Sequence, residues 1–207
     1  MNKGRLEAFS DGVFAIVMTL LIFDIKVPEL AQPVSDATLW RAIFEITPLL
    51  GAYFLSFAVL SALWINHHFI FHSFARAVDR HLNLLNLSYL SFVAFVPFSA
   101  HLIGTYDHNQ PAAIVYGLNI FLIVLLSWAM IRYIRRHPEL AHEGVSIRIS
   151  NQARFRAQLS LISYLLGLAA SFVFVPASLF FYIFPVVFNV IPGTLDLTER
   201  IFGLKLD

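Results

Sequence analysis

Four long stretches of this sequence contain no Asp, Glu, Lys or Arg, and they constrain the fold more than any other feature. Residues 46–75, 81–106 and 108–131 each have the length of one transmembrane helix, since about 20 apolar residues are needed to cross roughly 30 Å of hydrocarbon. The fourth stretch, residues 157–195, is too long for one crossing and long enough for two short ones. Because 58% of the 207 residues are hydrophobic and only 13% are charged, we predict an integral membrane protein.

The opening stretch and a break within the fourth stretch bring the predicted number of spans to six. Proline disfavours helix at the residue before it and lacks a backbone donor, so we expect the break near Pro176 to Ser178. The predicted fold class is all-α, with residues 1–207 forming a single membrane domain. The spans are expected at about residues 5–26, 46–73, 82–104, 112–134, 156–175 and 177–191.

Basic residues predict the orientation. Of the 14 Lys and Arg, 12 lie at the N-terminus, after the second span, between Arg132 and Arg156, or at the C-terminus. In a six-span chain these segments share one side, which the positive-inside rule makes cytoplasmic, with both termini inside. The first span carries Glu7 and Asp11 and lacks a small-residue cleavage site, so we expect it to stay in the mature protein.

The first span, which includes FSDGVFAIVMTLLIFDI at residues 9–25, can be divided into two faces. At 100° per residue, one stripe is centred on Ile16 and Asp11 lies about 140° away from it. An acid within a membrane seldom faces lipid, so we expect Asp11 to be buried against neighbouring helices, near a cation or a hydrogen-bond donor. The stripe consists of Phe9, Gly12, Ile16, Thr19, Leu20 and Phe23.

Polar residues of the second and third spans are candidate partners for Asp11. The second span ends, and the third begins, on the predicted cytoplasmic side, so their polar groups lie at about the depth of Asp11. Such groups often only tie helices together by hydrogen bonds, but their common depth favours a shared network. The candidate residues are His67, His68, Asn83 and Asn86.

The pattern Arg-x-x-x-Phe-Ser-Asp, formed by Arg5, Phe9, Ser10 and Asp11, resembles the signature of the transmembrane protein 175 family. This family comprises lysosomal potassium channels and their prokaryotic relatives. The resemblance extends along essentially the whole chain and includes the region of Trp64 and the two following histidines. One six-span repeat, as here, is typical of the prokaryotic members.

The resemblance implies a potassium-selective or weakly selective cation channel in the prokaryotic inner membrane, made of four identical subunits around a central pore. The first helix of each subunit would line that pore, with Ile16 as an apolar constriction, Thr19 hydroxyls beside it, and Leu20 and Phe23 extending a hydrophobic gate. Phe23 is bulkier than the aliphatic residue common in the family. No Thr-Val-Gly-Tyr-Gly filter is present in the sequence. The Arg5-to-Asp11 signature would have a structural role. Membrane lipids and potassium ions are the expected partners, with no cofactor, metal or nucleic acid.

Other functions are less well supported by the sequence. The alternative is a proton-coupled secondary transporter that uses Asp11, Asp24 and the histidines, although one repeat without paired helix breaks is atypical of that class. A metal-dependent enzyme could use His68 and His72, which are i,i+4 neighbours near His67, but no Glu lies among them to act as a base. We therefore expect no enzyme. A purely structural membrane protein remains open.

Overall fold

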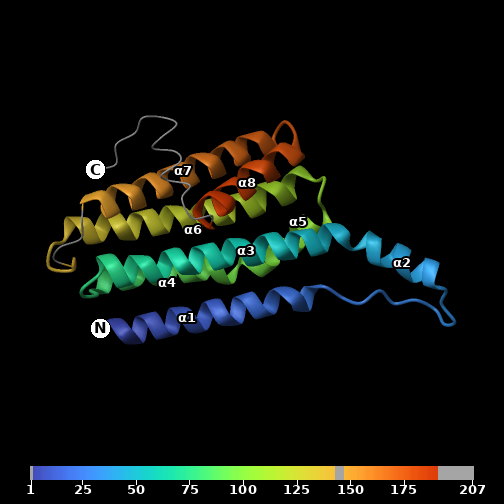
Figure 1. Ribbon diagram of the computed structural model, residues 1–207, viewed down its shortest axis with the longest axis horizontal. Coiled ribbons are helices and arrows are strands. Elements are labelled where there is room, and N and C mark those ends of the chain that lie inside the picture. The colour runs from blue at the N-terminus through green and yellow to red at the C-terminus, as the bar shows by residue number, and fades with distance from the viewer. Residues whose placement is uncertain (1, 143–146, 191–207) are drawn as a thin grey trace.

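The computed structural model describes residues 2–142 and 147–190, and this part of the chain is an elongated bundle of helices without a strand (Figure 1). The predicted all-α fold class is confirmed. Four helical segments of the described residues are long and apolar enough to cross a membrane, and the chain is a membrane protein. These segments are Lys3–Asp24, Thr47–Phe74, Arg80–Thr105 and Gln110–Arg136.

The first helix, α1 (Lys3–Leu20), lies along one long edge of the bundle and ends in a 3-10 turn, η1 (Leu21–Asp24) (Figure 1). Asn2 caps it by accepting a hydrogen bond from the backbone nitrogen of Gly4 at 2.9 Å, which satisfies one of the free donors of the first turn. The residues that it buries are spaced three or four apart, so they form one inward face. They are Leu6, Ser10, Phe14, Val17 and Leu21.

A short helix, α2 (Asp36–Glu45), stands at the far end of the bundle and leads into α3 (Thr47–Phe69) (Figure 1). Helix α3 continues as a π-helical turn, η2 (Ile70–Phe74). π-Helical turns are rare in proteins, but those that occur are often found at functional sites. This one begins two residues after His68 and contains His72.

The third predicted span consists of two helices, α4 (Arg80–Ala94) and α5 (Val96–Thr105). They meet at Phe95, and Pro97 lies in the first turn of α5. Backbone N–H groups of a first turn have no partner within the helix, so the N–H that proline lacks costs no helical hydrogen bond there. Next comes α6 (Gln110–Arg136), the most buried of the four candidate spans. It packs against α4, α5 and α7.

Helices α7 (Ile147–Ser171) and α8 (Val175–Val190) form an antiparallel pair on the side of the bundle opposite α1 (Figure 1). The turn between them lies at Phe172–Phe174, a few residues before the break expected near Pro176. Pro176 instead lies in the first turn of α8, which tolerates it. Helix α8 has 16 residues, fewer than the roughly 20 that cross a membrane without thinning it. Residue 191 of the sixth predicted span lies outside the described residues.

Candidate functional site

The outward face of α1 carries the stripe predicted from its helical spacing. Every member of this stripe is exposed in the single chain. Ile16 is 61% exposed and Phe23 is 74% exposed, although both are strongly apolar. A face of this kind must meet lipid, another subunit or a pore. Its members are Phe9, Gly12, Ile16, Thr19, Leu20 and Phe23.

Thr19 is the polar side chain of this stripe. Its hydroxyl donates to backbone oxygens of its own helix, with distances of 3.0 Å to Ala15 and 2.8 Å to Ile16. A hydroxyl that donates inward in this way keeps oxygen lone pairs directed away from the helix. The residue can therefore offer an acceptor oxygen next to the apolar side chain of Ile16.

The opposite face of α1 is held by a buried chain of hydrogen bonds that joins three helices. Asn86 of α4 donates from Nδ2 to Oγ of Ser10 at 3.1 Å, and Ser10 donates to the backbone oxygen of Leu6 at 2.9 Å. The Oδ1 of Asn86 lies 2.7 Å from Nε2 of His67 on α3. Because Oδ1 can only accept, Nε2 must carry a hydrogen. We call Ser10, His67 and Asn86 the α1 clamp.

Aromatic rings pack around His67, and all three residues of the α1 clamp are buried. The His67 ring lies 4.8 Å from the Phe71 ring and stacks on Tyr89 at 5.4 Å, while Phe14 of α1 packs 6.0 Å from His67. The Tyr89 hydroxyl donates to the backbone oxygen of Leu63 at 3.2 Å. Buried polar groups that are all paired in this way fix the relative positions of their helices.

Asp11 accepts a hydrogen bond from a neighbouring helix, but its side chain is not buried in the single chain. Its Oδ1 accepts from Nε1 of Trp64 on α3 at 2.9 Å, and both side chains are exposed. The expectation of burial is therefore wrong for one chain, because α1 lies at the edge of the bundle and this side of it is open. Sequence reasoning did not identify Trp64 as the donor. The sequence did offer one signal for this donor, which is that Trp64 lies one helical turn before His68 within an apolar span.

The remaining predicted residues lie outside the α1 clamp. His68 is exposed and stacks between Trp64 at 6.3 Å and His72 at 5.4 Å. Asn83 is half-buried and does not join the clamp, and Arg5 is exposed near the start of α1. Within the described ranges, no three His, Asp or Glu side chains are placed to hold a metal ion.

A second polar contact joins α4 to α6 near the basic end of α6. Asp79 caps α4 by accepting from the backbone nitrogen of Leu82 at 2.8 Å, and it accepts from the Tyr133 hydroxyl at 2.6 Å. Burial raises the pKa of the Asp79 carboxyl, but the bonds from Tyr133 and Leu82 outweigh that effect and hold the pKa below its ordinary 3.8. The carboxylate therefore stays charged at neutral pH.

These features define a class of protein: an α-helical membrane protein whose first helix is clamped from behind and presents an uncovered apolar face. Residues 5–97 match the family model described as endosomal/lysosomal potassium channel TMEM175. The chain is 39% identical over 184 residues to a potassium channel of Streptomyces collinus, which covers 86% of this chain and 87% of that protein. The protein belongs to the TMEM175 family, as the signature of α1 predicts.

Two further comparisons also match this chain to TMEM175 proteins. The crystal structure of a lysosomal potassium-selective channel TMEM175 homolog from Chamaesiphon minutus superimposes with a TM-score of 0.76 at 31% identity, covering 90% of this chain and 95% of that one. The bovine endosomal/lysosomal proton channel TMEM175 is 35% identical over 161 residues, which are 75% of this chain and 33% of that protein.

Proposed function

We propose that the protein is a potassium-selective or weakly selective cation channel whose pore is lined by α1 from each of four subunits. The uncovered apolar face of α1 carries this proposal, because it supplies a surface that the single chain leaves without a partner. Two observations support it. The relatives from Streptomyces collinus and Chamaesiphon minutus are named as potassium channels, and the alignments cover most of each chain.

In this mechanism four Ile16 side chains form the narrowest ring. An ion that passes an apolar ring must lose or compress its hydration shell, and potassium holds its water less tightly than sodium, so the ring favours potassium modestly. Thr19 lies one turn further along and offers hydroxyl oxygens to the partly dehydrated ion. Leu20 and Phe23 extend the apolar lining, which can close the pore by dewetting.

The α1 clamp has a structural role in this proposal. It holds the inner face of α1 against α3 and α4, so that the Ile16 side chain is kept in one position. We assign a structural role also to the other signature residues, Arg5, Phe9 and Asp11, and to His68 and Asn83. Asp11 ties α1 to Trp64 of α3, whereas Phe9 lies on the exposed stripe two turns before Ile16, where it can contact a neighbouring subunit. None of them meets the ion.

The proposed topology has six spans, both termini in the cytoplasm and residues 1–207 as one domain in the prokaryotic inner membrane. Helices α7 and α8 are its fifth and sixth spans. Their antiparallel pairing supports this assignment, as does the absence of Asp, Glu, Lys and Arg over residues 157–195. The basic residues at the start of α1, around the connection from α3 to α4, at the end of α6 and in the first part of α7 would then share the cytoplasmic side.

Ion flux into liposomes that contain the purified protein tests the function. We expect downhill potassium flux faster than sodium flux, and a loss of this preference by about fivefold, equivalent to about 1 kcal/mol, in Ile16→Asn. The matched control is Ile162→Asn, since Ile162 is 57% exposed on α7 at the opposite edge. Absence of downhill flux in the wild type would refute the channel. Potassium or sodium uptake only with a proton gradient would favour the proton-coupled transporter.

A further inference from the structure

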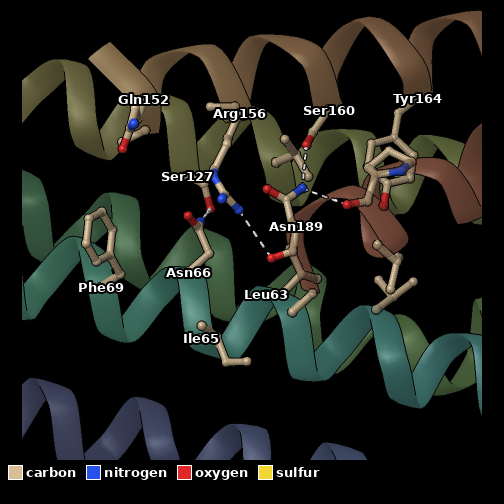
Figure 2. Close-up of a pocket in the computed structure, with 17 residues that line it drawn as sticks. Leu63, Ile65, Asn66, Phe69, Ser127, Gln152, Arg156, Ser160, Tyr164 and Asn189 are labelled. Atoms are coloured by element: carbon tan, nitrogen blue, oxygen red, sulfur yellow. Dashed lines mark hydrogen bonds between the residues drawn. The ribbon is translucent and has the colours of Figure 1, made fainter. Parts of the chain in front are cut away.

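A cavity of about 390 Å³ lies between α3, α6, α7 and α8 (Figure 2). This volume falls within the roughly 300–1,000 Å³ of small-molecule sites. Ile65 of α3 belongs to the lining and is 56% exposed, so the cavity opens on the outer surface of the bundle. In a membrane protein that surface meets the acyl chains of lipids, and apolar molecules dissolved in the bilayer can therefore reach the cavity.

The cavity is elongated along the helices that enclose it. Its α7 lining runs from Gln152 to Tyr164, which is about 18 Å at roughly 1.5 Å per residue. Its α3 lining runs from Val59 to Phe69, which is about 15 Å. Figure 2 shows the labelled residues of α7 on one side of the cavity and those of α3 on the other. This shape fits a linear molecule that lies parallel to the helices.

The described lining residues offer no unengaged charge to a ligand. Arg156 is the charged side chain among them. Its Nη1 donates to the backbone oxygen of Asn189 at 3.2 Å, and its guanidinium lies 6.0 Å from the centre of the Phe188 ring, so the arginine already has partners in the protein. An ionised ligand would lose its hydration here without gaining a free partner of opposite charge, which is costly. The cavity therefore favours a neutral molecule.

Tyr164 supplies an unused polar group to the lining. Its side chain is only 3% exposed, and its ring stacks on Tyr182 at 6.1 Å. The Tyr182 hydroxyl donates to the backbone oxygen of Ala113, but the Tyr164 hydroxyl has no hydrogen-bond partner within the described part of the chain. Buried hydroxyls are normally hydrogen-bonded. A ligand that brings an acceptor oxygen into the cavity would give Tyr164 the partner that it lacks.

We propose that the cavity binds a neutral, linear aliphatic molecule that carries one acceptor oxygen, as a long-chain alcohol does. The aliphatic chain packs against the apolar lining, which includes Leu63, Val124 and Val186, and the oxygen accepts from the Tyr164 hydroxyl. Such a molecule is already in an apolar medium when it is dissolved in the bilayer. The hydrogen bond, which lipid tails cannot supply, gives it the preference for the cavity. The inference is independent of ion conduction and of the oligomeric state.

Photolabelling of the purified full-length protein in detergent tests the proposal, with an octanol that carries an aliphatic diazirine as the probe. We expect saturable labelling of the lining segments of α3 and α7, located by mass spectrometry of the peptides and competed by unlabelled octanol. Ala157→Phe places a ring at a half-buried lining residue, and it should remove most of this labelling. Ala169→Phe makes the same change at an exposed residue of α7 outside the lining, and it should leave the labelling unchanged.

The contact with Tyr164 is tested with two competitors of equal chain length, octanol and octane. In Tyr164→Phe we expect octanol to compete about fivefold more weakly than in the wild type, because one hydrogen bond is lost, whereas octane should compete as before. Tyr106→Phe removes an exposed hydroxyl at the end of α5 and should change neither competitor. Labelling that does not saturate, or that is equal in Ala157→Phe and wild type, would overturn the site. Equal weakening of both competitors in Tyr164→Phe would overturn the hydrogen bond and with it the proposed class of ligand.

Discussion

At the scale of single residues, Asn86 does the most to fix the position of α1. It is fully buried, and its two polar atoms contact two different helices, Ser10 on α1 and His67 on α3. No other group can replace either contact without a rearrangement of the core. Loss of the amide would therefore leave the buried Nε2 of His67 without its hydrogen bond, and it would leave Ser10 with only the bond to the Leu6 backbone oxygen.

We expect Asn86→Leu to lower the free energy of unfolding by about 1–3 kcal/mol, the cost of leaving a buried donor or acceptor unpaired. Thermal unfolding of the purified protein in detergent would measure the change. Asn83→Leu makes the same substitution one helical turn earlier at a half-buried residue outside the α1 clamp. Its effect should be clearly smaller, and equal losses from both variants would contradict the role given to the clamp.

Asp79 provides a pH-dependent contact between α4 and α6. Its pKa in the folded protein lies below 3.8, so its stabilising effect is present at neutral pH and is lost as the pH falls through the folded pKa. Tyr133→Phe removes the hydroxyl that donates to Asp79 at 2.6 Å. The variant should melt below the wild type at neutral pH, and this difference should shrink as the pH falls below 3.8 and through the lower pKa of the folded protein.

The control for this prediction is Tyr106→Phe, at an exposed tyrosine at the end of α5. Its melting temperature should stay close to that of the wild type at each pH. A difference between Tyr133→Phe and wild type that stays constant from neutral to acidic pH would indicate that packing of the ring, and not the carboxylate, accounts for the stabilisation.

At the scale of helices, the sequence predicts an element best where the helical spacing of apolar residues continues and no proline or glycine pair interrupts it. The members of the α1 stripe follow from the 100° spacing alone, because no proline or glycine pair interrupts that helix, but the spacing does not predict which face is exposed, as Asp11 shows. The turn before α8 was harder to place, since Pro176 can lie inside a first turn as well as outside a helix. The cavity beside α7 depends on contacts between distant helices, and no local pattern at Arg156 and Asn189 reveals that they meet.

Close packing of α6, α7 and α8 depends on glycines that face the Tyr182 ring. A Cβ on Gly117 or on Gly167 would overlap with that ring, whose hydroxyl donates to the backbone oxygen of Ala113 at 3.1 Å. We expect Gly117→Ala to destabilise the protein by about 1–3 kcal/mol through overpacking. Thermal unfolding would show this as a lower melting temperature.

Gly51 on α3 provides the matched control, because a Cβ there meets nothing within 4 Å. Gly51→Ala should leave the protein equally stable or raise its stability by up to about 1 kcal/mol, since alanine favours the helix. If Gly117→Ala is as stable as Gly51→Ala, the close approach of α6 to Tyr182 is not required for the fold.

At the scale of the whole molecule, the position of α1 is the feature that a single chain does not explain. A buried polar clamp holds one face of the helix, yet the opposite face is apolar and uncovered at the edge of the bundle (Figure 1). A helix that is only a membrane anchor does not need such precise positioning. Four copies arranged around an axis would give that face a common centre and would explain why its orientation is fixed.

Cysteine crosslinking tests this arrangement directly, because the protein contains no cysteine of its own. If four α1 helices meet at the axis, Ile16→Cys should form disulfide-linked dimers in membranes after mild oxidation, since each thiol can pair with only one neighbour. Ile162→Cys is exposed to a similar extent on α7 but lies far from α1, and it should stay monomeric under the same conditions. Dimers in Ile162→Cys but not in Ile16→Cys would place the subunit contacts on the opposite edge and remove α1 from the pore.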